Sequence, residues 1–477
     1  MWRVIFLLAL SVCSHVATAA PLAEKLPEPL ASALRARGFS TQGLSIYVHE
    51  IGAPAPMVAF AADEPRHPAS VIKILTTLAA LEELGPVYQW RTEFWTTAPV
   101  HDGRLEGDLY LKGYGDPYLV IEHFWRLLRM LRQEGITTIT GDLVLDQSFF
   151  APDPDEEPGD FDGRSQRAYN VLPSALLVNF QAVNFRFIPD IAANRVRVYA
   201  EPWPAQLTLE NNLRLTRSGC RGWAGNVGMR VTQKAKQDTV VFSGSYDAAC
   251  GERDMFRVVS EPVPYVYGVF KTIWTEMGGR LEGDAREATV PEEARLVASI
   301  ASPPLADVIR SVNKYSNNVM TRQLLLTLGA RQDSPPGTTE KGIAEVRVWM
   351  KKRGLEFPEL VLENGSGLSR REVISARHLG DVLLAGYASP SMPEYLSSFP
   401  VSGLDGTMRH RLAGTPLEGR VHLKGGTINN VHAIAGYVLD RLNRRVAVVV
   451  LHNHPQAGTA AADAFQDAVM EWIYSRP

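Results

Sequence analysis

A chain of 477 residues is too long for one hydrophobic core, so roughly two to four domains are expected. Hydrophobic residues make up 45% and charged residues 21%, which is ordinary for a globular protein. The net charge of −3 argues against a nucleic-acid-binding surface, although it leaves room for a local basic pocket.

The first twenty residues predict an export signal. A single arginine precedes the apolar run Val4–Val12, and Ala17 and Ala19 have the A-x-A spacing of a cleavage site. Cleavage after Ala19 would remove that arginine and leave a net charge of −3 − 1 = −4. A lipid-attachment site at Cys13 is the alternative, but Val12 stands where a small residue is expected. No run reaches the length of a membrane span, so at most peripheral membrane contact is expected.

The rest of the chain alternates between segments with the pattern of β-strands and segments with the pattern of α-helices. Strand-like segments from residue 44 lead into a helix over "HPASVIKILTTLAALEELG", which ends at Gly85. The middle of the chain is β-rich with one clear helix, "IEHFWRLLRMLRQEG". Helical segments, three strands and a final helix follow it. These patterns predict one discontinuous α/β domain, residues 20–87 and 264–477, split by inserted β-rich domain(s) at 88–263.

Two reactive side chains share the N-terminal end of the first long helix. Ser70 and Lys73 form an S-x-x-K pair, and residues three apart lie on one face of a helix. A lysine with a pKa lowered by desolvation can take the serine proton and make the hydroxyl nucleophilic. Backbone N–H groups at the helix N-terminus would stabilise an oxyanion there. Alone, this pattern occurs by chance in many chains of this length.

Two further polar clusters follow in the second half of the chain. In "YSNNV", Ser316 offers a hydroxyl that can relay a proton, and Asn318 an amide that can bind a substrate carbonyl; helix capping is the alternative. In "HLKGGTINN", Lys424 would attract a carboxylate, and the glycines Gly425 and Gly426 would let a substrate backbone approach the strand edge. A plain Gly-Gly hairpin is the alternative there.

The order of the three clusters is similar to the S-x-x-K, S-x-N and K-[ST]-G set of penicillin-binding proteins and class A β-lactamases. Longer stretches extend the similarity: "PASVIKILTTLAAL", "GDLYLKGYGDP", "LPSALLVNFQAVNF", "NGSGLSR" and "FPVSGLDGT". The chain resembles the class C low-molecular-mass penicillin-binding proteins, the D-alanyl-D-alanine carboxypeptidase/endopeptidase or peptidase S13 family. That family inserts domains between its first two motifs, which agrees with the 316 − 70 = 246 positions between Ser70 and Ser316.

The resemblance implies the serine penicillin-binding/β-lactamase-like transpeptidase fold, of the α/β (α+β) class. It implies that Ser70 is the acylated nucleophile and Lys73 its general base. Ser316 and Asn318 would form the proton-relay and substrate-binding pair beside Lys424. The enzyme would hydrolyse D-Ala-D-Ala or cross-link amides of peptidoglycan in the periplasm, with no metal or organic cofactor.

The resemblance also implies a set of substrate-binding residues. The backbone N–H of Thr427, beside Gly426, would complete the oxyanion hole with that of Ser70. Arg370 would lie near the substrate's terminal carboxylate, and Asn429 would be a polar neighbour of the third motif. Positions in the insert that correspond to contacts with the diaminopimelate side chain in relatives are Asp162 and Tyr169.

Gly425 departs from the family pattern. Relatives carry Thr or Ser at this position, and the hydroxyl binds the substrate carboxylate. Losing a hydrogen bond to a charged group costs about 1.5–3 kcal/mol. We therefore expect an active enzyme that recognises a free terminal carboxylate less well and favours cross-linked substrates.

Several interpretations remain open at the level of sequence. A serine β-lactamase, and a peptidoglycan-binding protein catalytically impaired by Gly425, are the alternative functions. Once the signal is removed, Cys220 and Cys250 are left, which predicts one disulfide in an exported chain, with two unpaired thiols as the alternative. The expected partners are peptidoglycan peptides and β-lactam antibiotics as covalent inhibitors; no nucleic acid or metal is expected, and a homodimer is left open.

Overall fold

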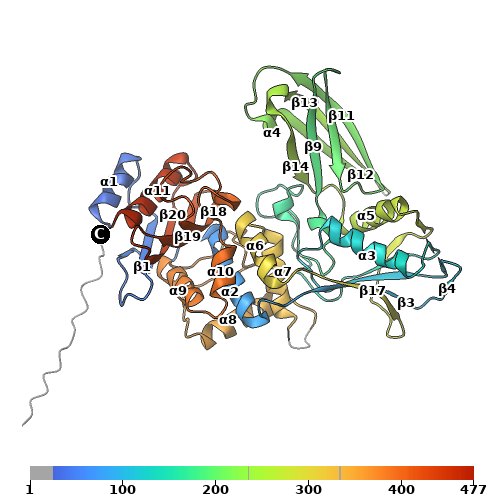
Figure 1. Cartoon of the computed structure of the whole chain (residues 1–477), viewed down its shortest axis with the longest axis horizontal. Coiled ribbons are helices and arrows are strands. Elements are labelled where there is room, and N and C mark those ends of the chain that lie inside the picture. Colours follow the sequence, from blue (N-terminus) through green and yellow to red (C-terminus); the bar gives the residue numbers. More distant parts are fainter. Residues whose placement is uncertain (1–24, 235, 332–334, 477) are drawn as a thin grey trace, which may run out of the picture.

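The computed structural model describes residues 25–234, 236–331 and 335–476, which form a protein of two lobes (Figure 1). The predicted signal peptide, including its cleavage site and Cys13, lies outside the described residues. Within the described ranges, no helix is both long and apolar enough to cross a bilayer. We call residues 25–90 and 302–476 the main lobe, and residues 91–301 the inserted lobe.

A five-stranded antiparallel sheet forms the centre of the main lobe. Because side chains alternate across a strand, Ile46 and Val48 face one hydrophobic core whereas Tyr47 faces another. Both faces of the sheet are therefore covered. In spatial order the strands are β18 (Val421–Ile428), β19 (Val431–Leu439), β20 (Arg445–Asn453), β1 (Leu44–Glu50) and β2 (Val58–Phe60).

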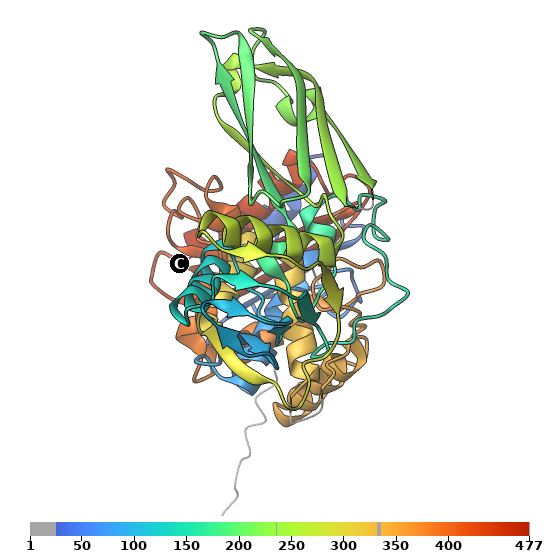
Figure 2. The ribbon, with the colours of Figure 1, turned by 90° about the vertical axis from the view of Figure 1, so that its right-hand side faces the viewer.

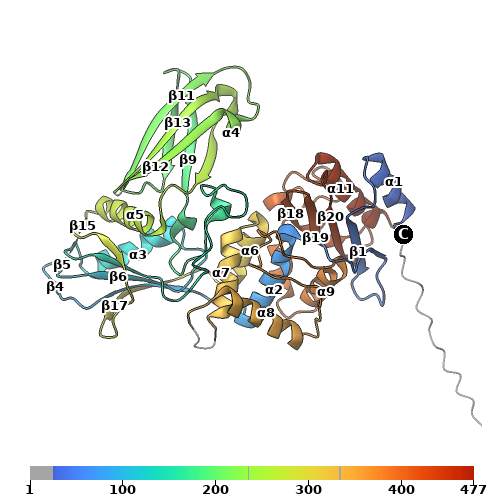
Figure 3. The same ribbon diagram turned by 180° about the vertical axis from the view of Figure 1, so that it is seen from behind.

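Helices cover the two faces of this sheet unequally (Figures 1 and 3). The face of Ile46 packs against α1 (Glu28–Ala36) and α11 (Ala460–Ser475). Helix α2 is buried without a break from Lys73 to Leu81, so polar side chains at its start lie inside the lobe. With α2 (Lys73–Leu84), the opposite face carries α6 (Leu305–Tyr315), α7 (Asn318–Gly329), α8 (Thr339–Lys352), α9 (Ala376–Tyr387) and α10 (Met392–Ser398).

Two sheets and two helices make the base of the inserted lobe. The apolar side chains of α3 recur at helical spacing, at Phe124, Leu127, Leu128 and Leu131, and are fully buried against the sheets. The helices are α3 (Ile121–Gln133) and α5 (Pro262–Glu276). One sheet contains β16 (Ala285–Glu287), β8 (Leu143–Asp146), β6 (Leu109–Gly113), β3 (Arg91–Thr96) and β17 (Arg295–Ala301). The other contains β15 (Arg280–Leu281), β7 (Thr138–Ile139), β5 (Arg104–Leu105) and β4 (Val100–His101).

Two three-stranded sheets rise from this base and project away from the rest of the molecule (Figure 2). Aromatic side chains fill the space between them, with Phe185 and Phe187 each 5.0 Å from Phe242 between ring centroids. The strands are β10 (Arg195–Glu201), β9 (Val183–Asp190) and β14 (Arg253–Arg257), then β11 (Leu207–Thr216), β13 (Gln237–Asp247) and β12 (Val227–Lys234), with the short helix α4 (Trp223–Asn226).

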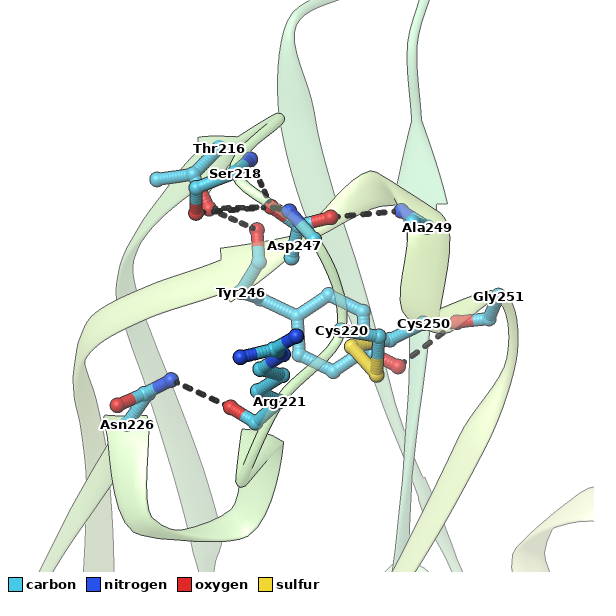
Figure 4. Close-up of a disulfide and its surroundings, with 11 residues drawn as sticks. Thr216, Ser218, Cys220, Arg221, Asn226, Tyr246, Asp247, Ala249, Cys250 and Gly251 are labelled. Atoms are coloured by element: carbon cyan, nitrogen blue, oxygen red, sulfur yellow. Dashed lines mark hydrogen bonds between the residues drawn. A yellow bond between two sulfur atoms is a disulfide. The ribbon is translucent and has the colours of Figure 1, made fainter.

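A disulfide joins Cys220 and Cys250 in this projecting part (Figure 4). It lies next to the carboxylate of Asp247, which accepts hydrogen bonds from the backbone N–H groups of Gly219 and Ala249 at 3.0 and 2.9 Å. The disulfide and the carboxylate together fix the chain between β11 and α4 against the end of β13. The expected pairing of the two cysteines is therefore present in the structure.

The inserted lobe continues further along the chain than the expected boundary at residue 263. The ring of Phe270 in α5 lies 6.0 Å from that of Phe94 in β3, and β17 pairs antiparallel with β3. Residues 264–301 therefore belong to the inserted lobe, and assigning them to the catalytic domain was wrong. The expectation failed because an amphipathic helix does not reveal in its sequence which core it packs against.

Candidate active site

The site lies where the edge strand β18 meets η1 (Ala69–Ile72), the 3-10 turn that leads into α2. A Cβ atom at Gly426 would stand 2.7 Å from the amide nitrogen of Ser70 and 2.9 Å from that of Val71. Only glycine allows the two backbones to approach this closely. Gly426 therefore brings the strand edge against the backbone N–H groups beside Ser70.

Ser70 and Lys73 are in hydrogen-bonding contact. Ser70 lies in the 3-10 turn, and Lys73 is the first residue of α2. The sequence pattern places Ser70 itself at the start of this helix, so the α-helix begins slightly later than expected. The Nζ of Lys73 lies 3.0 Å from the Oγ of Ser70 and 2.7 Å from the Oδ1 of Asn318, and it also donates to the backbone carbonyl of Ser366. The lysine side chain is fully buried and its nitrogen points at the serine hydroxyl.

The second motif occupies a break between two helices. Ser316 ends α6 in the left-handed region, with φ of 56°, and α7 begins at Asn318. Asn317 caps α7, because its side chain accepts the N–H of Met320 at 3.1 Å. The capping role and the binding role are thus divided: Asn317 caps, while Ser316 and Asn318 face the site.

Lys424 links the third motif to the second. Its Nζ donates to the Oγ of Ser316 at 2.8 Å, and its side chain is fully buried. Hydrogen bonds thus join Ser70, Lys73 and Asn318 in one group and Ser316 with Lys424 in another, and the charge of Lys424 acts on Lys73. The five residues form one cluster, although they come from three distant parts of the chain. The main-lobe fold brings together all five residues proposed from the sequence.

Burial changes the acidity of both lysines. Desolvation lowers the pKa of Lys424 to about 7. Desolvation also holds the pKa of Lys73 well below its usual value; the charge of Lys424 lowers it further, while the carboxylate of Glu372 raises it. Because a neutral amine is a base and an ammonium is not, this environment suits Lys73 to accept the Ser70 proton near neutral pH.

Glu372 is a component of the site that the sequence did not reveal. Its buried carboxylate accepts backbone N–H groups of residues 363, 364, 365 and 367 at 2.8–3.1 Å. These bonds fix the loop whose Ser366 carbonyl receives Lys73. Desolvation raises the pKa of Glu372, and the backbone N–H groups and Lys73 oppose that shift. The sequence around "SGLSRR" does not mark the glutamate that follows it as a site residue, because the partners of Glu372 are backbone groups and these leave no pattern of residue types.

Asp162 and Tyr169 lie in the inserted lobe but reach the cluster. The Tyr169 hydroxyl donates to Asp162 at 2.6 Å, and the Tyr169 carbonyl accepts the side-chain amide of Asn318 at 3.2 Å. Desolvation pushes the pKa of Asp162 upward, but the hydrogen bonds from Tyr169 and Asn170 outweigh it and keep the pKa low. An ionised carboxylate therefore stands at the lobe junction.

Arg370 joins this junction as well. Its guanidinium lies 3.9 Å from the ring centroid of Phe161 and donates to the Phe161 carbonyl at 3.4 Å. Since Phe161 precedes Asp162, the arginine stands beside the carboxylate's loop. Phe161 is a further contact that the sequence did not reveal.

The remaining substrate-binding candidates lie along and after β18. Thr427 is exposed, and its hydroxyl is 3.0 Å from the Nδ1 of His432, whose Nε2 is 2.9 Å from Asp463. Asn429 is exposed in the turn between β18 and β19. A Cβ at Gly425 would meet no heavy atom within 4 Å. The space that a Thr or Ser side chain would occupy is therefore open and is not filled by another group of the protein.

No group of three or more His, Cys, Asp or Glu side chains that could hold a metal ion occurs among the described residues. The chemistry available to the cluster comes from two hydroxyls, two amines with lowered pKa values, a side-chain amide and backbone N–H groups. Such a set suits nucleophilic acyl transfer.

Comparison with known proteins decides the family. A family model described as D-Ala-D-Ala carboxypeptidase 3 (S13) matches residues 26–475. The chain belongs to this peptidase family. The resemblance inferred from the motifs is thereby confirmed. A D-alanyl-D-alanine carboxypeptidase of Actinomadura sp. (strain R39) is 30% identical over 422 residues, which are 84% of this chain and 76% of the relative.

Other similar proteins and structures extend the match. A D-alanyl-D-alanine carboxypeptidase of Haemophilus influenzae is 26% identical over 407 residues, 82% of this chain and 81% of that protein. The crystal structure of penicillin-binding protein 4 from Haemophilus influenzae aligns with a TM-score of 0.76 at 22% identity, over 94% of this chain and 99% of that chain. A predatory peptidoglycan endopeptidase from Bdellovibrio bacteriovorus aligns with a TM-score of 0.54 at 15% identity, over 90% and 92%. These structures confirm the expected penicillin-binding fold.

Proposed function

We propose that this S13 peptidase is a serine D-Ala-D-Ala carboxypeptidase and DD-endopeptidase that acts on peptidoglycan peptides through an acyl-enzyme at Ser70. The observation that carries the proposal is the contact between the buried Lys73 amine and the Ser70 hydroxyl at 3.0 Å, at a site completed by Asn318 and by the Ser316–Lys424 pair. Family membership supports the peptidase activity, and the geometry supports the serine mechanism.

Acylation begins when neutral Lys73 takes the proton of Ser70. The Ser70 Oγ then attacks the carbonyl carbon of the penultimate D-alanine, and the backbone N–H groups of Ser70 and Thr427 receive the oxyanion. The C–N bond breaks, and the departing amine takes a proton from the Lys73 ammonium or through the Ser316 hydroxyl. An ester at Ser70 and a neutral Lys73 remain.

Deacylation uses the same groups in reverse. Water attacks the ester carbonyl and gives its proton to Lys73, and the Ser70 oxygen leaves and recovers that proton. Lys424, held against Ser316, supplies positive charge beside the relay hydroxyl. No step requires an electron donor or acceptor.

The junction of the lobes supports a proposal for the substrate class. The carboxylate of Asp162 would attract an amine, and Arg370 beside it would attract a carboxylate. Diaminopimelate carries both groups on its side-chain end, so we propose that Asp162, Tyr169 and Arg370 bind it. In this arrangement Arg370 serves the side chain of the diaminopimelate that precedes the two D-alanines, rather than the terminal carboxylate.

The open space at Gly425 supports a preference between the two reactions. Lys424 and Thr427 remain to meet a free terminal carboxylate, but the neighbouring hydroxyl is absent. In a cross-linked substrate the amide nitrogen belongs to a second peptide, whose other residues offer further contacts, so that substrate depends less on the missing hydroxyl. We therefore propose that the enzyme favours cross-linked peptides, that it works in the periplasm, and that β-lactams acylate Ser70.

Mass spectrometry with penicillin tests the proposal. The intact protein should gain the full mass of the antibiotic at Ser70, because the opened lactam ring stays attached as an ester. The Ser70→Ala variant should gain nothing. Absence of the adduct in the unaltered protein would refute the serine mechanism and favour an impaired binding protein, whereas rapid loss with release of penicilloate would identify a β-lactamase.

A further inference from the structure

A second cleft opens beside the catalytic cluster, between the inserted lobe and the loop that joins α6 to α7. It has a volume of about 710 Å³, and Ser316 and Asn318 form part of one wall. The opposite wall comes from β14 and from the segment before the 3-10 turn η2 (Ala168–Asn170). Nothing in the proposed acyl-transfer mechanism uses this second wall.

Two arginines stand side by side on that wall. Arg167 immediately precedes η2, Arg257 ends β14, and the two residues form an isolated antiparallel bridge. The neighbouring backbone bond, from the N–H of Val258 to the carbonyl of Gln166, is 3.0 Å long and fixes the pairing. Two guanidinium groups are thus held close together by the backbone.

Neither arginine has a carboxylate partner among the described residues. The Arg257 guanidinium donates only to the adjacent Phe256 carbonyl, at 2.7 Å. Desolvation lowers the pKa of Arg257 to about 10, and the charge of Arg167 lowers it further. Two half-buried like charges without a counter-ion destabilise the free protein.

Other arginines of the inserted lobe show that this arrangement is not general. Arg186 lies 3.2 Å from both Glu252 and Asp254, and Arg195 lies 3.2 Å from Asp190. Asp254 also borders the cleft, but it is already paired with Arg186. The Arg167–Arg257 pair therefore retains its full attraction for an external anion.

The cleft also offers apolar surface next to this charge. Tyr315 and Phe256 line it and are 71% and 55% exposed, which is unusual for aromatic side chains. A ligand that satisfies both features carries carboxylates on an extended chain with apolar or ring-shaped parts. Arg167 lies two residues before Tyr169, whose carbonyl accepts a hydrogen bond from Asn318. The arginine pair is therefore close along the chain to a residue that contacts the catalytic cluster.

We propose that Arg167 and Arg257 form an anion subsite that binds the carboxylates of the second peptide stem of a cross-linked peptidoglycan substrate. The inference rests on the proposed function and extends it. The residues of the acyl-transfer cluster act on the amide bond that is broken, and the arginine pair binds the second peptide stem. A carboxylate bound by two guanidinium groups forms charge-assisted hydrogen bonds of the stronger kind.

Equilibrium binding tests the subsite without requiring turnover. The probe is a soluble cross-linked peptide dimer with free carboxylates, measured by calorimetry against Ser70→Ala protein with and without Arg167→Gln and Arg257→Gln. The double substitution should weaken binding by at least about ten- to 150-fold, the range expected for losing even one hydrogen bond to a charged group. A dimer whose carboxylates are converted to carboxamides should bind both proteins equally weakly.

Controls separate this role from a structural one. Arg230→Gln on β12 removes an exposed arginine that does not line the cleft and should leave the affinity unchanged. Arg167→Lys with Arg257→Lys should restore part of the binding by retaining charge, even if the glutamine variants fold poorly. Equal losses for the carboxylate and carboxamide dimers, or no loss for either, would overturn the subsite.

The outcome is independent of the test of the proposed function. Penicillin acylation of the protein with intact Ser70 reports the serine mechanism alone. If acylation proceeds and the arginine variants bind the dimer as well as the parent, only the subsite is refuted. If acylation fails but the carboxylate-dependent binding is found, the subsite stands and the proposed hydrolysis does not.

Discussion

The main lobe and the inserted lobe bury charge in different ways. At the catalytic cluster, Lys73, Lys424 and Glu372 are all completely buried, and the two amines lie close enough to lower the pKa of Lys73. In the inserted lobe, the buried Asp146 is paired with Lys112 at 3.2 Å, and Asp247 is satisfied by loop N–H groups (Figure 4). The structural charges Asp146 and Asp247 each have a local partner that compensates them, whereas the two buried lysines of the site disfavour each other's protonation.

The contrast between the two lobes indicates that the catalytic cluster is less stable than a matched set of charges would be, and that its groups are more reactive. A buried cation beside another cation costs free energy that a matched pair recovers. Perturbed pKa values at such a cluster are typical of groups that must gain and lose protons during a reaction. Substitutions in the two lobes should therefore separate loss of activity from loss of stability.

The largest expected effect is on acylation. Lys73→Met should slow acylation of Ser70 by penicillin by about 10²–10⁴-fold, the usual contribution of a general base, while the melting temperature stays the same or rises. Lys112→Met in the inserted lobe should do the reverse, because it leaves Asp146 buried without its partner. Stopped-flow acylation and calorimetry measure both quantities. A normal acylation rate in Lys73→Met would contradict its assignment as the base.

The next effect concerns the stability of the projecting sheets. Replacing Cys220 and Cys250 by serine opens a crosslink between residues 30 positions apart and should destabilise the inserted lobe by about 2–4 kcal/mol. Acylation of Ser70 should be unchanged, because the disulfide is remote from the main lobe. Chemical denaturation followed alongside penicillin labelling checks this. Parallel losses of stability and acylation would show that the lobes are not independent.

Glu372→Gln should affect both properties of the site. Backbone N–H groups lose an ionised acceptor, which costs about 1.5–3 kcal/mol, and the Ser366 loop loosens. Because the carboxylate raises the pKa of Lys73, its removal should shift the acidic limb of the acylation profile to lower pH while the maximal rate falls. Acylation rates from pH 5 to 9 provide the measurement. A fall in rate with no shift of the limb would leave Glu372 a purely structural role.

The pH dependence of stability should expose the burial of Lys424. Its pKa is about 7 in the folded protein and roughly 10.4 when unfolded, so between these values the unfolded chain binds more protons. The destabilisation is complete below pH 7 and disappears as the pH rises toward 10. Relative to Lys424→Met, the free energy of unfolding should rise by up to about 1.4 kcal/mol per pH unit in this window. A constant difference between the two proteins would mean that burial does not lower the pKa of Lys424.

The smallest expected effect is a change of preference. Gly425→Thr places a hydroxyl in open space and should raise the ratio of carboxypeptidase to endopeptidase rate by up to about tenfold. Gly458→Thr, at another open glycine of the main lobe, is the matched control and should leave the ratio unchanged. Chromatography of products from a pentapeptide and a cross-linked dimer gives the two rates. An unaltered ratio of the two rates would show that Gly425 does not influence the choice of substrate.

The motifs were readable in the sequence because their chemistry depends on short spacings. Ser70 and Lys73 are one turn apart, and Ser316 and Asn318 flank a helix start, so local geometry alone sets each pair. Cys220 and Cys250 could be paired because no other cysteines follow the predicted signal. Glu372, Phe161 and the Arg167–Arg257 pair gave no such signal, since their partners are backbone groups or residues far away in the chain.

By itself the sequence determined the kind of chemistry, the S13 resemblance and the alternation of helices and strands, because these follow from residue type and periodicity. That residues 264–301 join the inserted lobe, and that Arg370 lies beside Phe161, could be seen only in the folded protein. The same holds for the empty space at Gly425. The physical reason is common to all three: burial, proximity and free volume depend on which surfaces meet, and surfaces distant in sequence meet only after the chain has folded.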